Sequence, residues 1–590
     1  MGCENIVTIS LLALCLGVIG ANARVKAHVG YVQERLMGNT WCGVPAQTLA
    51  GAVCGSLRSS YLGRTYASFR GVPYARQPLG DLRFVVKFSD GFFDASVEGP
   101  VCPQRDVLYG PMMQPRSMGE DCLHVNVHVP AGYLPRWDRE CCGSACLPVV
   151  CFIHGGAFQS ESGDSDFNGP EYMIDELVVV ITINSRLGPF GFLSLNSSSV
   201  PGNTGLRDMV AALQWVQDNV RAFGGDPQQV TLMGQSSGAS NAHILSLSEA
   251  SRGLFQRLIL MSGTAGSGFF TTRPSYAQSV KSSFLKQLGI NSTDADEIHR
   301  QLVALPAQAL VDANSVLLAS SGFVVFCPVV ESEFYGVTRI LDDDPDILVA
   351  GGRGSQYTTL LGFTNNECAS LRHRLEEVDI IGTIKKNPNA ILPTKLMFSV
   401  PPAQQPVDAK QIIDRYFHGP PTMDKFIPAC SDSFFIYSTL KLAEARFMIG
   451  GAPLYLYQFS YGSPYVPVKR AFGINYKGAG HMDDLSYVLC VNSMLKDTVM
   501  NDSDEAVKDW MTDIVANFVV CGNMTCGTDT SETWPDVACS VGGWDCRGQR
   551  GLRYQDIRGP AWAMSHLTRE QRSMIKFFDQ MYGAWTCPYL

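Results

Sequence analysis

The sequence predicts an α/β fold in which a central, mostly parallel sheet is flanked by helices, with the active site at the carboxyl ends of the strands. Residues 147–153 and 177–183 are continuous apolar runs, typical of strands buried on both faces. Residues 205–220 have apolar side chains near helical spacing and end before a Gly-Gly-Asp-Pro loop. Strands that alternate with helices build a parallel sheet whose chemistry gathers at the carboxyl ends.

The first 23 residues have the pattern of a secretory signal peptide. Residues 6–20 are apolar but short for a bilayer span, and small residues at positions 21 and 23 fit a cleavage site. The segment before them contains no Lys or Arg, so an uncleaved anchor is the alternative. No repeat or long polar linker divides the rest. We expect residues 24–590 to form a single domain that is secreted to the extracellular space, without stable membrane insertion.

The composition and the net charge of the chain limit the classes of function and partner that we expect. Of the 590 residues 46% are hydrophobic and 17% charged, which fits a chain with an extensive core. The formal net charge of -9 is spread along the chain rather than clustered, so we do not expect nucleic acid as a partner. The densest acidic run, at residues 342–346, is interpreted as a solvated loop rather than a metal site.

Cysteines and glycosylation sequons also fit the secretory route. Removing the two cysteines of the signal segment from nineteen leaves seventeen, an odd number, so at least one is free or intermolecular. Cys587 is the candidate for an interchain bond in a homodimer. Cys141, Cys142 and Cys146 crowd one loop, where disulfides are favoured and zinc is the alternative. Sequons predict glycosylation at Asn196, Asn291, Asn501 and Asn523.

Ser236 is the candidate nucleophile. The apolar run 230–233 breaks into Gly-x-Ser-x-Gly at residues 234–238 and then into a helix-compatible segment. In a nucleophile elbow the serine occupies a strained strand-to-helix turn, where Gly234 and Gly238 would remove clashing side chains. The pentapeptide alone also fits an ordinary turn, because the chain contains 56 glycines.

An attacking serine also needs amide donors for the oxyanion. The strand 147–153 is followed directly by His154 and two glycines, whose bare backbone can turn N–H groups toward a substrate carbonyl. We nominate the amides of Gly156, Ala157 and Ser237 as the oxyanion hole. A tight turn without a catalytic role is the alternative for the glycine pair.

The remaining requirements are a base and an acid that orients it. Glu367 is the only carboxylate in the polar loop after the apolar run 360–363. His481 follows small residues late in the chain. A lone loop glutamate is normally solvated and a lone loop histidine is more often structural. The order Ser236, Glu367, His481 is nevertheless the nucleophile, acid and base order of α/β hydrolases, and it predicts a catalytic triad.

Over nearly the whole mature chain the sequence resembles the carboxylesterase type B family, which includes cholinesterases, juvenile hormone esterases and other insect carboxylesterases. The resemblance implies the α/β-hydrolase fold and a disulfide between Cys102 and Cys122. Asn366, Cys368 and Ala157 depart from frequent family residues. Neuroligin-like proteins share the fold without a working triad, so a noncatalytic adhesion or ligand-binding role is the alternative. The matching stretches are residues 69–75, 119–127, 184–192, 223–227, 234–238 and the loops of Glu367 and His481.

The resemblance and the triad predict a serine carboxylic ester hydrolase that forms an acyl-enzyme and needs no metal or organic cofactor. No tryptophan lies between Cys102 and Cys122, where related cholinesterases bind quaternary ammonium by a cation-π contact. Gln235 stands where cholinesterases have glutamate and is similar to the juvenile hormone esterase group. We therefore expect apolar carboxylic esters as small-molecule substrates, with a juvenile-hormone-specific esterase as the alternative.

Overall fold

The computed structural model describes most of the chain. The predicted signal peptide (residues 1–23) and Cys587 lie outside the described residues. The described residues are 36–37, 40–75, 92–105, 108, 117–137, 139–141, 143–494, 500–526, 534–537, 540–541, 544–545, 552–560 and 562–583.

A 13-stranded sheet forms the centre of the molecule, in the order β17-β16-β13-β12-β11-β10-β8-β9-β7-β5-β4-β3, with β6 beside β4. All pairs from β9 to β16 are parallel, whereas the outer strands pair antiparallel except for β6. The sheet is therefore mostly parallel, as the sequence predicts. Its strands are β3 (Val44–Thr48), β4 (Gly51–Ser59), β5 (Thr65–Pro73), β6 (Phe92–Asp94), β7 (His124–Pro130), β8 (Leu147–Ile153), β9 (Val179–Ile183), β10 (Gly225–Gln235), β11 (Arg257–Met261), β12 (Thr358–Thr364), β13 (Leu454–Phe459), β16 (Arg553–Ile557) and β17 (Trp562–His566).

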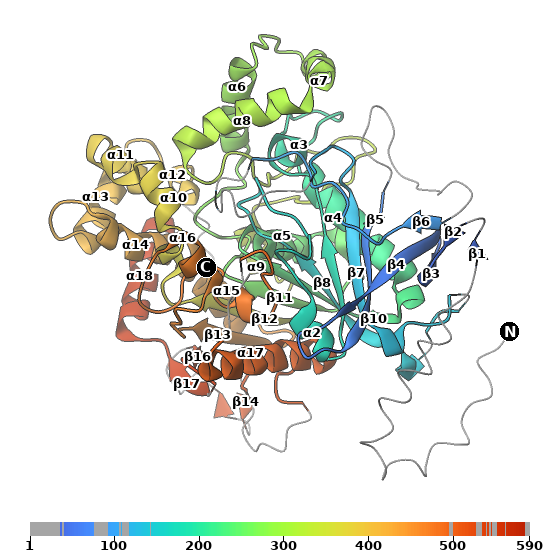
Figure 1. Cartoon of the computed structure of the whole chain (residues 1–590). Coiled ribbons are helices and arrows are strands. Elements are labelled where there is room, and N and C mark those ends of the chain that lie inside the picture. The colour runs from blue at the N-terminus through green and yellow to red at the C-terminus, as the bar shows by residue number, and fades with distance from the viewer. Residues whose placement is uncertain are drawn as a thin grey trace.

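Helices lie on both sides of this sheet, with a lobe of α6–α8 at the top of the view and a second lobe of α10–α14 at the left (Figure 1). The longer helices are α4 (Thr204–Asn219), α5 (Ser237–Leu247), α6 (Pro274–Gln287), α7 (Ala295–Ala304), α8 (Ala307–Ser321), α13 (Gln405–Tyr416), α14 (Met423–Ser431), α15 (Tyr437–Ile449), α17 (Asp502–Cys521) and α18 (Arg569–Gly583). The shorter ones are α2 (Glu171–Asp175), α3 (Gly188–Phe192), α9 (Pro345–Ala350), α10 (Arg372–Glu377), α11 (Ile380–Lys386), α12 (Thr394–Met397) and α16 (Pro467–Phe472).

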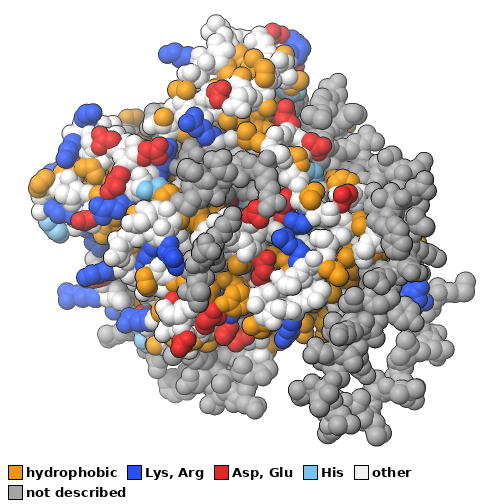
Figure 2. All heavy atoms as spheres, in the orientation of Figure 1, with side chains coloured by type: hydrophobic (Ala, Val, Ile, Leu, Met, Phe, Trp, Pro, Cys, Tyr) orange, Lys and Arg blue, Asp and Glu red, His pale blue; other side chains and the backbone are white. Residues whose placement is uncertain are grey.

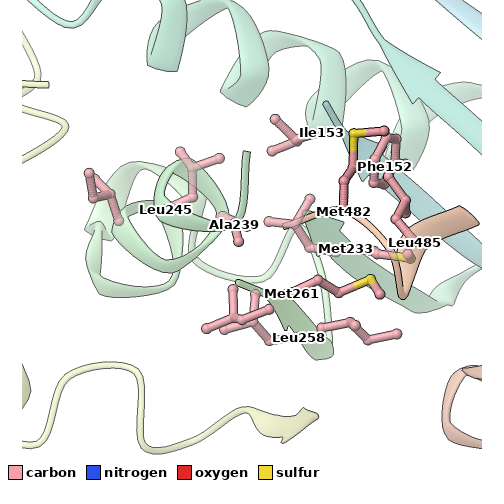
Figure 3. Close-up of a cluster of buried hydrophobic side chains, with 14 of the residues drawn as sticks. Phe152, Ile153, Met233, Ala239, Leu245, Leu258, Met261, Met482 and Leu485 are labelled. Carbon is pink, nitrogen blue, oxygen red and sulfur yellow. The ribbon is translucent and has the colours of Figure 1, made fainter. Parts of the chain in front are cut away.

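The core that supports the elbow joins strands, a helix and a late loop. Figure 3 shows Met233 of β10 and Met261 of β11 in one cluster with Ala239 of α5 and Met482 of the loop after His481. None of these side chains is more than 1% exposed. Apolar burial of this kind is the main stabilising contribution to the fold. It anchors the loop that carries His481 against the strands that carry Ser236.

Five disulfides lie within the described residues: Cys42–Cys54, Cys102–Cys122, Cys141–Cys146, Cys368–Cys430 and Cys521–Cys526. The open question about the cysteine-rich loop is thus answered in favour of a disulfide for Cys141 and Cys146. Across the described part of the chain no cluster of ligand side chains could hold a metal ion. No single described helix is long and apolar enough to cross a bilayer, although the bent pair α7–α8 passes that length and composition test when taken together.

Candidate active site

Ser236 lies in the turn between β10 and α5, as the elbow pattern predicts. Its backbone has φ 57° and ψ −126°, an unfavourable conformation for a residue with a side chain. The neighbouring strand holds the turn in place, because the Ser236 N–H donates to the Met261 carbonyl at 2.8 Å. Helix α5 crosses the end of β8 so closely that a Cβ on Gly238 would lie 2.2 Å from the Ile153 carbonyl oxygen. The elbow therefore requires glycine at this position.

Glu367 and His481 meet although 114 residues separate them. The distance from His481 Nδ1 to Glu367 Oε2 is 2.6 Å, and the two side chains are 4% and 0% exposed. Glu367 Oε1 accepts hydrogen bonds from the Ser262 hydroxyl and the Thr364 N–H, each at 2.7 Å. Because the carboxylate faces Nδ1, this pairing assigns the proton to Nδ1 and leaves the lone pair of the ring on Nε2.

The loops that carry these two residues are also joined through their backbones. The His481 N–H donates to the Glu367 carbonyl at 2.8 Å, and the Asn366 N–H donates to the Ala479 carbonyl at 2.9 Å. The Ser370 hydroxyl donates to the His481 carbonyl at 3.0 Å. Glu367 and His481 are thus held to each other by main chain as well as by side chains.

The other edge of the His481 ring faces the elbow. Gln235, the residue before Ser236, has its amide nitrogen 3.3 Å from His481 Nε2 and is 1% exposed. In the assigned tautomer this amide donates to Nε2. The His481 ring is therefore oriented by Glu367 on one side and lies against the residue next to Ser236 on the other.

The loop after β8 lies against the same elbow. A Cβ on Gly155 would lie 3.1 Å from the Ser236 Cβ, and the Phe158 N–H donates to the Ser237 hydroxyl at 3.1 Å. Gly156 and Ala157 have φ of 85° and 56°, so the loop turns tightly there. The Ser237 N–H is in the first turn of α5, where helix geometry offers no intrahelical acceptor. The three nominated amides thus come from two segments that meet beside Ser236.

Two more buried carboxyl groups follow His481 in the chain. Burial raises the pKa of Asp483 to about 7, although the Tyr476 hydroxyl and the Gly480 N–H donate to it. Burial likewise raises the pKa of Asp484 to about 6, and this group accepts from the Tyr457 hydroxyl at 2.8 Å. Desolvation disfavours the charged form of a carboxyl group, so Asp483 and Asp484 lose their protons at higher pH than solvent-exposed aspartates do.

Three residues that support Glu367 were not predicted from the sequence: Ser262, Cys430 and Ser431. Ser262 is the first residue after β11 and has φ 53°, so a polar residue at a strand's carboxyl end was the available signal. Cys368, which departs from the frequent family residue, bonds to Cys430. Pairing between distant cysteines cannot be deduced from one sequence.

The remaining predicted residues are a pair of cysteines and four sequon asparagines. Cys102 and Cys122 are bonded to each other. Asn196, Asn291 and Asn501 are exposed, and Asn523 is partly exposed, so glycosylation at these sequons stays a prediction. Acidic and basic side chains are interspersed over the face seen in Figure 2.

Comparisons with known proteins agree on one family. The carboxylesterase family model matches residues 44–542. The chain is 45% identical over 544 residues to a juvenile hormone esterase of Heliothis virescens, covering 91% of this chain and 94% of that protein. It is 32% identical over 520 residues to esterase FE4 of Myzus persicae, covering 83% and 86%. The crystal structure of juvenile hormone esterase from Manduca sexta, with OTFP covalently attached, superposes with a TM-score of 0.86 at 45% identity, covering 92% of this chain and 99% of that one.

Proposed function

Because this chain belongs to the carboxylesterase family and is a carboxylic ester hydrolase with the α/β-hydrolase fold, we propose that it cleaves apolar esters through an acyl-enzyme on Ser236. His481 is the base in this proposal and Glu367 is the acid that orients it. The single observation that carries the assignment is the buried 2.6 Å contact between His481 Nδ1 and Glu367 Oε2. That contact leaves Nε2 toward the elbow, where a base must lie to take a serine proton.

In the acylation half-reaction, Ser236 Oγ attacks the ester carbonyl carbon while His481 Nε2 takes the hydroxyl proton. The carbonyl π electrons move to oxygen, and the amides of Gly156, Ala157 and Ser237 stabilise the resulting oxyanion. The intermediate collapses, the bond to the alcohol oxygen breaks, and the imidazolium returns its proton to the leaving alcohol. Glu367 stabilises the imidazolium throughout.

Deacylation repeats these steps with water. His481 takes a proton from water, the hydroxide attacks the acyl carbon, and the second tetrahedral intermediate expels Ser236 Oγ, which takes the proton back. The products are the carboxylic acid and the regenerated serine. Ester, water and three side chains supply every proton and electron pair in this cycle, so the proposal requires no metal or cofactor.

For the substrate we propose apolar carboxylic esters. A juvenile-hormone-specific esterase is the second candidate, favoured by 45% identity to the Heliothis virescens juvenile hormone esterase. A neuroligin-like noncatalytic role is not favoured, because the relatives named above are esterases.

We also propose that residues 24–590 are secreted as one domain after loss of residues 1–23. The five disulfides support an oxidising compartment. A homodimer through Cys587 would appear on a non-reducing gel.

The deciding experiment compares the secreted protein with its Ser236→Ala variant. A panel of p-nitrophenyl esters from acetate to decanoate measures hydrolysis and reports the acyl preference, and a fluorophosphonate followed by peptide mass spectrometry locates the reactive serine. We expect labelling at Ser236 and at least an about 10³-fold loss of kcat in the variant, with an unchanged Tm. A folded variant that keeps its activity, or a label on another serine, would overturn the assignment.

A methyl ester with a long branched apolar acyl chain, assayed beside the panel, separates the two substrate candidates. A general esterase would hydrolyse the p-nitrophenyl esters and the branched methyl ester with comparable kcat/KM. A juvenile-hormone-specific enzyme would prefer the branched methyl ester by orders of magnitude.

A further inference from the structure

Glu367 lies in a short turn and not in a long helix or a strand. It begins a single 3-10 turn, Glu367–Ala369, that follows β12. Such short turns have poorer hydrogen-bond geometry than an α-helix, so their position depends on what surrounds them. The backbone hydrogen bonds described above join Glu367 to His481, but these bonds fix the two residues only relative to each other. Ser262 and Gln235 link the pair to the strands next to Ser236, which follows β10, and further contacts add to these.

A disulfide provides the first of these further contacts. Cys368, the residue after Glu367, is bonded to Cys430 on α14 across 62 residues of sequence, with a Cα–Cα distance of 6.0 Å. Both cysteines are at most 1% exposed. The bond therefore ties the acid's turn covalently to a buried position on a helix.

Ser431, next to Cys430, provides a second anchor on the same turn. The Cys368 N–H donates to the Ser431 hydroxyl oxygen at 2.9 Å. That hydroxyl donates its own proton to the Ile427 carbonyl at 2.8 Å, one helical turn back. Because the proton is committed to Ile427, a lone pair of the Ser431 oxygen faces the Cys368 amide.

The same helix then reaches the base. After α14 the chain continues through a π-helical turn, Asp432–Ile436, into α15. π turns occur frequently at functional sites, because they change the direction of the side chains around them. Phe435 in this turn has its ring centroid 4.5 Å from that of His481, at an interplanar angle of 40°. One helix thus contacts the acid's turn through two bonds and the base through an aromatic ring.

We propose that the segment 427–436, which we call the support helix, positions the Glu367–His481 pair relative to Ser236, with Cys430 and Ser431 as positioning residues. This inference rests on the proposed function. Misplacing a catalytic group by about 1 Å can cost about 10²-fold in rate. Loosening the support helix should therefore lower kcat while KM changes little, because no residue of the support helix is assigned to bind the ester.

The test compares two disulfide removals in the full secreted protein. Cys368→Ser with Cys430→Ser releases the acid's turn, and Cys141→Ser with Cys146→Ser removes a disulfide from the loop before β8 as the control. Both are assayed with the preferred p-nitrophenyl ester well below their Tm. We expect kcat to fall about 10-fold or more in the first double variant, with KM within about 3-fold, and to stay near the wild-type value in the control.

Ser431→Ala and Ser431→Thr keep the disulfide and decide the question if the double variant does not fold. Alanine removes the acceptor for the Cys368 amide and should lower kcat, whereas threonine retains a hydroxyl and should restore most of it. Equal kcat in all variants, or the same loss in the control, would overturn the positioning role. Wild-type turnover together with an inactive Ser236→Ala protein shows separately that the proposed function holds.

Discussion

Ser262 illustrates how far a buried carboxylate depends on residues outside its own loop. Its hydroxyl donates to Glu367 Oε1 at 2.7 Å, and its side chain is fully buried. A hydrogen bond to a charged group contributes more than one between neutral groups, and a buried charge left without a donor is costly. The hydroxyl also leaves Glu367 Oε2 as the oxygen that faces His481.

We predict that Ser262→Ala lowers kcat about 10-fold with little change in KM, because Glu367 loses a donor and becomes less well oriented. Ser262→Gly should lower kcat similarly but be about 1 kcal/mol more stable than the alanine variant, because residue 262 has φ 53°, which glycine adopts without strain. Steady-state kinetics and thermal unfolding check both values. Ser282→Ala, on an exposed part of α6, is the control. Wild-type kcat in both Ser262 variants would contradict the prediction.

At the scale of elements, the sequence predicts those whose local pattern is strong. The apolar run 147–153 is β8 over its full length, whereas β9 begins two residues later than the run at 177–183. The helical spacing at 205–220 corresponds to α4, Thr204–Asn219. These elements could be predicted because the pattern of apolar residues along the sequence indicates which side chains of each element are buried.

In the site, too, residues with a local sequence pattern could be predicted and residues without one could not. Ser236 and Glu367 each follow an apolar run, His481 follows small residues, and the three occur in a recognisable order, so sequence reasoning could nominate them. The partners of Glu367 could not be found that way, because Ser262 and Cys430 reach it only through the folded chain. Ser262 is 105 residues away, and the disulfide spans 62 residues. Contacts at such separation leave no local periodicity in one sequence.

Helix α17 offers a test of a predicted glycosylation site that also caps an element. The Asn501 side-chain oxygen accepts from the N–H groups of Ser503 and Asp504, at 2.9 and 3.0 Å. A glycan would attach to the amide nitrogen, which leaves this oxygen free to cap the helix. Asn501→Ala should therefore lose the glycan and about 1 kcal/mol of stability.

Ser503→Ala destroys the same sequon but keeps the cap, so it should lose the glycan with little loss of stability. Asn501→Asp is a second control that retains a capping oxygen. Mass spectrometry before and after enzymatic deglycosylation measures occupancy, and thermal unfolding of the deglycosylated proteins measures the cap. Equal stability of Asn501→Ala and Ser503→Ala would show that the cap contributes nothing.

The whole molecule contains two sets of buried ionisable groups with opposite effects on stability. Burial raises the pKa of Asp432 to about 6, of Asp483 to about 7 and of Asp484 to about 6. Burial lowers the pKa of His128 to about 3, of His154 to about 4 and of His243 to about 3. Each set therefore binds protons differently in the folded and unfolded states, which makes stability depend on pH.

The direction follows from which state binds more protons. Between the unfolded aspartate value of about 3.9 and the folded value of about 7, folded Asp483 holds a proton that the unfolded chain has released. Its contribution to stability is thus greatest in acid and is lost as pH rises toward 7. For the buried histidines the unfolded chain binds the extra protons below about 6.5, so their contribution falls as pH falls. The two sets oppose each other between pH 4 and 6.5.

Removing one carboxyl group should expose the histidine contribution. We predict that the Asp483→Asn variant is less stable than wild type by the smallest amount near pH 7 and by the largest amount near pH 4. The Tm of the variant therefore rises more steeply with pH across this window than the Tm of wild type. Asparagine can still accept from the Gly480 N–H, which preserves the 2.7 Å contact to this loop. The measurement is Tm by differential scanning fluorimetry at half-unit steps from pH 4 to 8, with Asp312→Asn on the exposed side of α8 as the control. Parallel Tm curves for Asp483→Asn and wild type would mean that Asp483 is already ionised in the folded protein at pH 4, and that the compensation between buried acids and bases does not operate.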